Sequence, residues 1–301
     1  MADVDEAQPA AAAVDSKILD GITSWRGFTD LTQIFERKGR DKATSKFSCT
    51  LYTLIDTEDN ATIYFGQVDA PKREVSLERA KQSLARIPDD ALYPVLPAEL
   101  QANATEQLPP PDTQYYLKRP KILNYRHAVG TTDLADHLLE EALTLDLLRR
   151  NPHPNVGVCD GYWVPPGKHG RMAGIILRRY SMTLHDYIGL QKSGSDSEDP
   201  AAAAAAAAVR AAKYMQELTA AADHLHSLGV AHNDINPRNI MLDENDSIVL
   251  VDLGSCKPLG EELTEFGTPP FNEGFDEVSA KKNDEIGLQQ IQAWLGLAAA
   301  Q

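Results

Sequence analysis

This chain of 301 residues has few of the features that identify zinc-binding or membrane-spanning proteins. Its three cysteines, Cys49, Cys159 and Cys256, lie far apart and form none of the short spacings of a zinc site. So few scattered cysteines suit a reducing compartment. No apolar run reaches the length of about 18 residues that a membrane-spanning helix needs, so we expect no contact with a membrane.

Basic residues are outnumbered as well. Lys and Arg total 29 against 44 Asp and Glu, which gives a formal net charge of −15. Because nucleic-acid-binding surfaces are normally basic, we expect no nucleic-acid partner. The N-terminus, MADVDEAQPAAAAVD, has neither the basic start nor the apolar core of a signal peptide, so we expect a cytoplasmic or nuclear protein. Residues 1–16 are expected to be disordered.

The first third of the sequence predicts a hairpin and two short helices. Residues 47–55 and 61–68 are rich in β-branched and aromatic residues and flank the polar turn DTEDN, which predicts a β-hairpin. We expect helices at 30–37 and 74–87, the second ended by Pro88. The prolines that follow predict an extended connector over residues 92–111.

The remainder alternates strand and helix patterns. Residues 115–118 predict a strand that ends in a lysine, and apolar residues three and four apart predict a helix over 133–150. A strand is expected at 174–177. Residues 213–228 predict a further helix, which eight alanines before it are expected to extend at its N-terminal end.

The most informative stretch, VAHNDINPRNIMLDENDSIVLVDLG, occupies residues 230–254. Asn239 follows Asp234 by five residues, and a short apolar run leads to Asp252 with Gly254 behind it. A carboxylate can accept the proton of a hydroxyl, and carboxylate and amide oxygens are the ligands that hard divalent cations prefer. These groups together indicate transfer of a phosphoryl group. A surface hairpin with solvated acids is the alternative, but it requires no such spacing.

This stretch resembles the protein-kinase-like superfamily. H-N-D-I-N-P-R-N, residues 232–239, looks like the catalytic loop H-R-D-L-K-P-x-N, and D-L-G, residues 252–254, looks like D-F-G. The resemblance implies an α+β, bilobal protein-kinase-like fold with an atypical small lobe and a C-terminally shortened large lobe. It also implies ATP and Mg²⁺ as cofactors.

The resemblance assigns roles to residues of the loop. Asp234 would take the proton of the acceptor hydroxyl, and Asn239 and Asp252 would hold Mg²⁺. Asn236 stands where Ser/Thr kinases usually carry a lysine that stabilises the transferring phosphate. His232 is expected to be a packing and hydrogen-bonding anchor rather than a base.

Further roles fall on residues before and after the loop. Lys118 takes the place of the lysine that holds the non-transferred phosphates, and Glu141 that of the helix glutamate that pairs with it. Lys121 and Glu140 are rivals for these roles, because register alone does not separate them. The segment that follows the strand at 174–177 resembles the hinge that contacts adenine, which places the gate position near Ile176.

The C-terminal part carries two more similarities. G-T-P-P-F, residues 267–271, looks like the end of a kinase activation segment. Residues 283–288 resemble the start of the long large-lobe helix, whose aspartate, here Asp284, steadies the catalytic loop. An acid that interacts with the dipole of its own helix is the alternative reading of Asp284. Gly254 and Asp284 are thus the expected structural supports.

The resemblance covers about residues 90–301 and is closest to poorly characterised kinase-like proteins of fungi. Within it we expect a small lobe at 91–180 and a large lobe at 181–301. Before it we expect the disordered tail at 1–16 and an N-terminal extension at 17–90 that belongs either to the small lobe or to something separate.

The sequence also departs from the family in three places. No G-x-G-x-x-G precedes Lys118, so donors to the phosphates would come from elsewhere. Asn233 replaces the arginine that pairs with a phosphate on the activation segment, so we expect no activation by phosphorylation there, at Thr264 for example. Asn236 replaces a lysine, and this replacement either lowers the rate of phosphoryl transfer or marks another kind of acceptor.

Three functions are compatible with these residues. The first is a protein kinase of the Ser/Thr type that acts on a protein hydroxyl. The second is a phosphotransferase for small molecules, similar to choline and aminoglycoside kinases, since His-Asn-Asp before an Asn occurs there too. The third is a pseudokinase that serves as a nucleotide-binding scaffold.

Overall fold

The computed structural model describes the chain with several gaps. The described residues are 14, 16–37, 45–110, 114–193, 199–264 and 267–296. Most of the tail that was expected to be disordered, residues 1–13 and 15, lies outside them, as do residues 194–198. The described elements mix helices with antiparallel and parallel strands, so the expected α+β class is confirmed.

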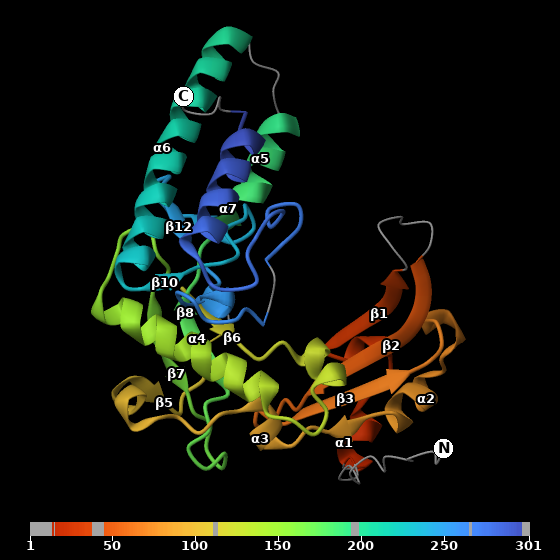
Figure 1. The fold of residues 1–301 in the computed structure, drawn as a ribbon. Coiled ribbons are helices and arrows are strands. Elements are labelled where there is room, and N and C mark those ends of the chain that lie inside the picture. The colour runs from red at the N-terminus through yellow and green to blue at the C-terminus, as the bar shows by residue number, and fades with distance from the viewer. Residues whose placement is uncertain are drawn as a thin grey trace, which may run out of the picture. The chain divides into compact units, whose positions relative to one another are not determined.

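The chain forms two compact units, whose helices and strands are labelled in Figure 1. Unit 1 comprises Met1–Leu108, Arg119–Leu139 and Tyr162–Gly174. Unit 2 comprises Pro109–Lys118, Glu140–Gly161 and Ile175–Gln301.

A four-stranded antiparallel sheet in the order β1-β2-β3-β4 forms the centre of unit 1. Its strands are β1 (Asp30–Arg37), β2 (Ser45–Ile55), β3 (Ile63–Val68) and β4 (Ala85–Arg86). The predicted hairpin is confirmed, because β2 pairs with β3 from Thr50↔Val68 to Ile55↔Ile63. This hairpin belongs to a different sheet from the strand that carries Lys118.

Two helix predictions in unit 1 need correction. Residues 30–37 are strand β1, because β2 is long enough to offer them a pairing edge over their whole length. Pairing of this kind outweighs weak local propensity. The helix predicted over 74–87 is confined to α2 (Leu77–Gln82), where the Ser76 hydroxyl accepts the N–H of Arg79 at 3.2 Å. The residues after it form β4 along β3 instead.

The core of unit 1 is aromatic. Tyr52 of β2 is fully buried and lies 5.3 Å from Phe28 and 5.9 Å from Trp25, measured between ring centroids. The remaining short elements of unit 1 are α1 (Ser16–Gly21), α3 (Asp89–Leu92), β5 (Ala104–Thr105) and 3₁₀ turns at Trp25–Gly27, Lys72–Glu74, Ala98–Asn103 and Ile122–His127.

A second sheet, in the order β5-β7-β8-β6, carries the predicted lysine strand. Its remaining strands are β6 (Tyr115–Lys118), β7 (Cys159–Trp163) and β8 (Gly174–Arg178). The strands predicted at 115–118 and 174–177 are therefore confirmed. β6 pairs antiparallel with β8, so that Tyr116 lies opposite Leu177 and Lys118 opposite Ile175. Helix α4 (Asp133–Arg150) has the predicted bounds.

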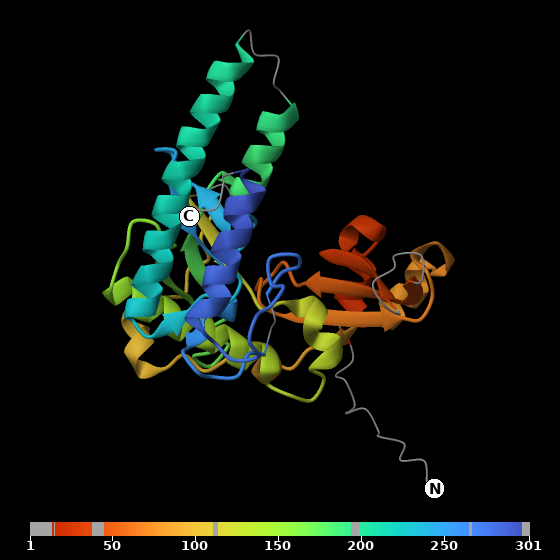
Figure 2. The same ribbon diagram turned by 45° about the horizontal axis from the view of Figure 1, so that its top comes forward.

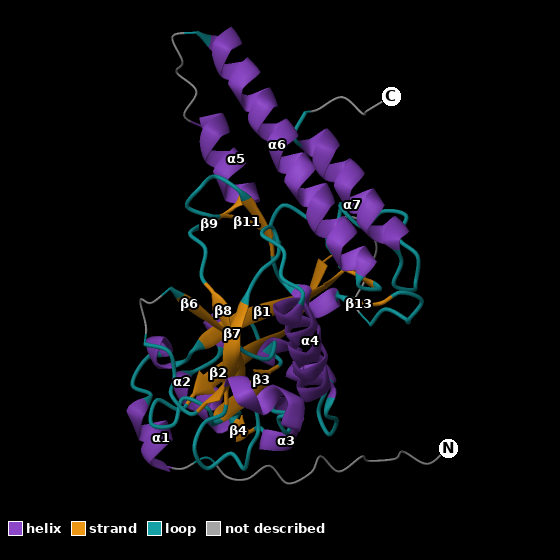
Figure 3. Cartoon of the chain, turned by 90° about the vertical axis from the view of Figure 1, so that its left-hand side faces the viewer, coloured by secondary structure: helices purple, strands orange, loops and turns teal. Residues whose placement is uncertain are grey.

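Helices make up much of unit 2. They are α5 (Leu184–Ser193), α6 (Pro200–Ser227) and α7 (Lys281–Trp294), and α6 packs against α7 (Figures 2 and 3). The alanines do extend α6, which begins where the Asp199 carboxylate accepts the N–H groups of Ala201 and Ala202. Gly229, with φ +81°, follows its C-terminal end.

A small hairpin sets the positions of the loops in unit 2. Strand β11 (Ile240–Leu242) pairs with β12 (Ile248–Leu250) and with β9 (Met182–Thr183), and β10 (Val230–Ala231) pairs with β13 (Lys257–Pro258). Since β11 and β12 are antiparallel, the residue before β11 meets the residue after β12. The N–H of Val251 accordingly donates to the carbonyl of Asn239 at 2.9 Å.

Within the described parts of the chain, no helix has both the length and the apolar character needed to cross a membrane.

Candidate active site

Three side chains from three elements of unit 2 form an ion-paired group. The Lys118 ammonium at the end of β6 lies 2.6 Å from Glu141 Oε1 on α4 and 2.5 Å from Asp252 Oδ1 after β12. Glu141 is buried, and only 14% of the Lys118 side chain is exposed. Burial alone would lower the pKa of Lys118, but the two carboxylates raise it well above its ordinary value. The amine therefore stays a cation that can bind phosphate oxygens.

Helix periodicity explains why Glu141 faces inward. It lies on the same side of α4 as Leu138, Ala142 and Leu145, all of which are buried. Its rival Glu140 is half exposed and lies 3.2 Å from Lys257. The other rival, Lys121, is exposed. The structure thus brings Lys118 and Glu141 together, and neither rival belongs to this group.

Asp252 has an unusual backbone. Its φ of 61° and ψ of 73° are left-handed, a conformation that few residues other than glycine adopt. Such strain is kept where the surroundings require a particular side-chain direction. Here the backbone turns the carboxylate toward Lys118. Gly254 lies beside the group, since a Cβ added there would be 3.4 Å from Asp252 Oδ1.

The Asp234 carboxylate is held by two amides of its own loop. Asn236 donates through Nδ2 to Oδ1 at 2.9 Å, and Asn239 donates through Nδ2 to Oδ2 at 2.9 Å. Because Asn239 turns its nitrogen toward Asp234, its oxygen faces away from that carboxylate. Asn236 is buried and also accepts the N–H of Arg238. The two amides fix the direction of Asp234.

Thr268 also contacts Asp234, which the sequence did not lead us to expect. Its hydroxyl donates to Asp234 Oδ2 at 3.1 Å across 34 residues of sequence. Thr268 lies in the G-T-P-P-F segment, and this motif was the sequence feature that could have pointed to it. The contact links that segment to the loop of Asp234.

His232 and Asp284 lie beneath the loop and are fully buried. Asp284 accepts the backbone N–H groups of His232 at 2.9 Å and Asn233 at 2.8 Å, and its Oδ2 lies 2.8 Å from His226 Nε2. The His232 ring bridges the carbonyl of Val251 and the N–H of Asp234. Both side chains contact backbone groups of the loop, so their contacts are those of supports.

Asn233 is a second residue whose contacts the sequence did not reveal. It is fully buried at φ 59°, and its Nδ2 donates to the Ala231 carbonyl, the Ser255 carbonyl and Ser279 Oγ. Its Oδ1 accepts Asn283 Nδ2 at 3.1 Å. This neutral side chain joins the loop to the segments before and after residues 265–266.

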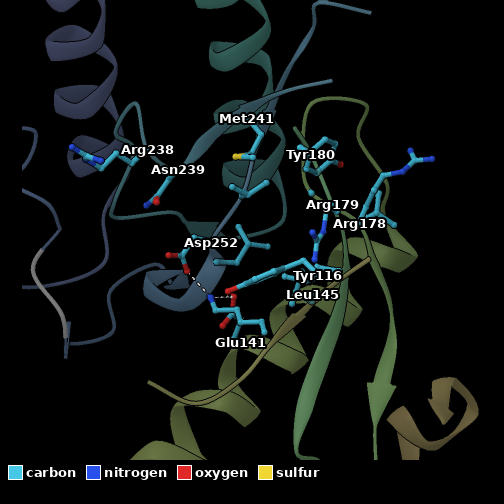
Figure 4. A pocket seen from close by; sticks show the side chains of 16 residues that line it. Tyr116, Glu141, Leu145, Arg178, Arg179, Tyr180, Arg238, Asn239, Met241 and Asp252 are labelled. Atoms are coloured by element: carbon cyan, nitrogen blue, oxygen red, sulfur yellow. Dashed lines mark hydrogen bonds and ion pairs between the residues drawn. The ribbon is translucent and has the colours of Figure 1, made fainter. Parts of the chain in front are cut away.

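A cavity of about 340 Å³ opens beside the ion-paired group (Figure 4). That volume is at the lower end of the range for small-ligand sites. The lining residues are Tyr116, Lys118, Glu141, Leu145, Gly157, Val158, Leu177, Arg178, Arg179, Tyr180, Arg238, Asn239, Met241, Val251, Asp252 and Leu253. All of them belong to unit 2. Ile176, expected near the gate position, is buried and is not a lining residue; Leu177, on the other face of β8, is.

Residues 121–272 match the family described as "Protein kinase domain", and this segment makes up just over half of the chain. The chain belongs to the protein kinase domain family. The matched segment contains the loop of Asp234 and also Asp252. Lys118 lies before it and Asp284 after it.

Several kinases share shorter segments with this kinase domain. Serine/threonine-protein kinase PknG of Mycolicibacterium smegmatis is 31% identical over 119 residues, which are 40% of this chain and 14% of PknG. Serine/threonine-protein kinase PKH1 of Saccharomyces cerevisiae is 38% identical over 108 residues, 35% of this chain and 12% of PKH1. Sgk1-A of Xenopus laevis is 42% identical over 66 residues, 21% of this chain and 15% of Sgk1-A. The matches thus span 12 to 15% of these relatives.

The donors in this kinase domain fit a magnesium ion bound together with a nucleotide. Asp252 supplies a carboxylate and Asn239 an amide oxygen, both on the cavity wall. The described residues contain no cluster of three or more His, Cys, Asp or Glu suited to a metal. A site with two protein oxygens suits Mg²⁺, which usually binds one or two protein side chains plus phosphates.

Proposed function

We propose that this kinase domain transfers the γ-phosphoryl group of ATP to a hydroxyl of a protein, in the manner of Ser/Thr kinases. Three relatives with 31 to 42% identity over their matched segments are serine/threonine-protein kinases by name. The observation that carries the proposal is the Lys118–Glu141–Asp252 group at the cavity, with Asp234 and Asn239 in the adjoining loop. A solvated surface hairpin, the alternative reading of these residues, would not bury an ammonium group between two carboxylates.

Each residue has a role in the proposed reaction. Lys118, oriented by Glu141, binds oxygens of the non-transferred phosphates. Asp234, aligned by Asn236 and Asn239, orients the acceptor hydroxyl and takes its proton as the oxygen attacks phosphorus. The bond from the γ-phosphorus to the bridging oxygen breaks, and ADP leaves.

Magnesium would be held by Asn239 and Asp252, and when bound it neutralises charge on the phosphates. Lys118 and Asp252 are paired directly in the structure. We infer that Lys118 turns from Asp252 to the phosphates when Mg-ATP enters, so that Asp252 can serve the metal. His232 and Asp284 support the loop without touching the substrates.

A scaffold without turnover is the second candidate, and one observation favours it. β6 is the last strand in its sheet, so among the described residues no hairpin covers the strand that carries Lys118. Kinases of ordinary type close a glycine-rich loop over the phosphates. Without one, nucleotide would bind less tightly and leave sooner.

Nucleotide binding is tested by thermal unfolding of the wild type and of Asp252→Asn with and without Mg-ATP. We expect Mg-ATP to raise the midpoint of the wild type and to have little effect on Asp252→Asn. ATP with EDTA in place of Mg²⁺ is the control. A wild type that millimolar Mg-ATP leaves unchanged would remove both nucleotide-based functions.

The acceptor class is tested by supplying labelled ATP with generic protein substrates in one series and with amino alcohols such as choline in another. We expect label in protein Ser and Thr. Transfer to the amino alcohols alone would favour the small-molecule kinase. The likeness to fungal kinase-like proteins and the cytoplasmic or nuclear location remain predictions.

A further inference from the structure

Tyr116 is an exposed aromatic residue on the wall of the nucleotide cavity. It lies on β6, two residues before Lys118, and 51% of its surface is exposed. The sequence patterns assigned it no role. A large aromatic side chain that is half exposed at a cavity is typical of a surface that a ligand covers.

Strand geometry places Tyr116 on the same face as Lys118. Side chains two residues apart project from the same side of a strand, about 7 Å apart along it. The register between β6 and β8 puts Leu177 directly opposite Tyr116, and Leu177 also lines the cavity. Tyr115 projects from the other face, is 39% exposed, and is not a lining residue.

The wall of the cavity carries both charged and apolar side chains. Lys118, Glu141 and Asp252 supply charged groups. Tyr116, Leu177, Val158 and Met241 supply apolar surface to the same wall. Figure 4 shows Tyr116 and Met241 on the cavity with Glu141 and Asp252. A nucleotide needs both kinds of contact, because its phosphates are anionic and its base is flat and weakly polar.

The strand that carries Tyr116 is fixed at both ends. At its start, Arg179 donates its backbone N–H to the carbonyl of Gln114 at 2.7 Å and its Nε to the carbonyl of Tyr115 at 3.1 Å. At its end, Lys118 is held by its two carboxylates. The ring of Tyr116 is therefore presented by a rigid backbone, which lowers the entropy lost on binding.

We propose that Tyr116 stacks on the base of a bound purine nucleotide and so takes over the cover that a glycine-rich hairpin would provide. The inference rests on the proposed nucleotide-binding function and adds the residue that recognises the base. A phenol ring has the area and rigidity for stacking, and such contacts accept any flat base, purines best because of their larger surface.

An obstructing role makes the opposite prediction. If the ring filled the cavity and kept nucleotide out, removing it would improve binding. The sign of the effect of Tyr116→Ala therefore separates the two roles.

Binding of Mg-ATP, adenosine and inorganic tripolyphosphate is measured by calorimetry on the full chain for wild type, Tyr116→Ala, Tyr116→Phe and Tyr115→Ala. We expect Tyr116→Ala to weaken Mg-ATP and adenosine by a similar factor of about ten, and tripolyphosphate by less than about twofold. Tyr116→Phe keeps the ring and should bind like wild type. Tyr115→Ala is the matched control from the other face of β6 and should also bind like wild type.

Unfolding midpoints without ligand verify that each variant is folded. Unchanged or tighter adenosine binding by Tyr116→Ala would overturn the stacking role while leaving the proposed function intact. An equal loss for tripolyphosphate and adenosine would also overturn it, since that is the signature of a displaced strand. A wild type that binds neither Mg-ATP nor adenosine overturns this inference and the proposed function together.

Discussion

At the scale of single residues, the site depends on how the charge of a buried lysine is balanced by nearby carboxylates. Lys118 keeps its positive charge despite burial because Glu141 and Asp252 lie on either side of it. Glu141 is the more buried of the two carboxylates, at 5% exposure against 41%. Under the proposed mechanism, Glu141 therefore remains the partner of Lys118 when Lys118 turns from Asp252 to the phosphates.

We predict that Glu141→Gln lowers phosphoryl transfer by about ten- to a hundredfold, because a neutral amide no longer fixes the Lys118 ammonium. Steady-state kinetics with Mg-ATP measure the effect. Glu140→Gln is the matched control on the next position of α4 and should change turnover less than about twofold. Equal effects of the two substitutions would contradict the assignment of Glu141.

Asn233 yields a prediction about stability. Its side chain donates to three groups and accepts from Asn283 without access to water. Asn233→Ala should lower the free energy of unfolding by about 2–4 kcal/mol, because several buried polar groups lose their partner. Urea unfolding measures it. Asn245→Ala, in an exposed turn, should cost less than about 1 kcal/mol.

The same residue bears on activation. Asn233 carries no charge to pair with a phosphate, and its hydrogen bonds already reach Ser255 and Ser279. We predict that Thr264→Glu leaves turnover within about twofold of wild type. A many-fold rise in turnover in the same kinetic assay would show that a cation elsewhere in the chain pairs with the negative charge at residue 264.

Sequence reasoning reached some of these residues and missed others for a physical reason. Asp234, Asn239 and Asp252 stand in short motifs whose spacing alone indicates the chemistry. The contacts of Thr268 and Asn233 join segments 22 to 50 residues apart, and only the folded chain reveals such partners.

At the scale of elements, the strongly patterned ones were predictable. Helix α4 and the strand β6 have the expected bounds, because apolar spacing and β-branched or aromatic content marked them clearly. β1 was predicted as a helix, since its pairing with β2 lies outside any local pattern. Leu177 lines the cavity and its neighbour Ile176 does not, because successive residues of a strand project from opposite faces.

The turn after α4 leads to a prediction about pH. The His153 ring stacks on His224 of α6 with centroids 5.0 Å apart, and its Nδ1 accepts the N–H of Asn155 at 3.2 Å. Burial, and then the neighbouring His224, lower the pKa of His153 below its ordinary 6.5. The folded state therefore favours the neutral ring, while the unfolded state binds a proton as the pH falls through about 6.5.

Stability should accordingly decrease as the pH falls from the ordinary pKa toward the lowered one. We predict that His153→Gln, which cannot titrate, loses less thermal stability than wild type between about pH 7 and pH 5.5. Unfolding midpoints over this range test the sign. Parallel curves for the two proteins would show that His153 does not contribute.

At the scale of the whole molecule, every proposed functional residue belongs to unit 2, while unit 1 has its own sheet and aromatic core. The segment that matches the protein kinase domain, residues 121–272, contains the loop of Asp234 and Asp252 in unit 2 and also parts of unit 1. In the sheet of unit 1, the sequence predicted the hairpin of β2 and β3, whereas the residues of β1 and β4 were expected to be helical.

We predict that Phe28→Ala, in the core of unit 1, lowers stability by about 3–5 kcal/mol but leaves the affinity for Mg-ATP unchanged where the protein is folded. Unfolding curves and calorimetry on the same samples measure both quantities. A loss of affinity in step with the loss of stability would mean that unit 1 contributes to the nucleotide site.

The central claim is that Asp234 takes the proton in a phosphoryl transfer from ATP. It is tested most directly by single-turnover transfer from labelled ATP to a protein substrate, with wild type and Asp234→Asn compared at equal occupancy by Mg-ATP. We predict that the variant binds Mg-ATP like wild type and transfers at least about a hundredfold more slowly. Full transfer by Asp234→Asn would contradict the account.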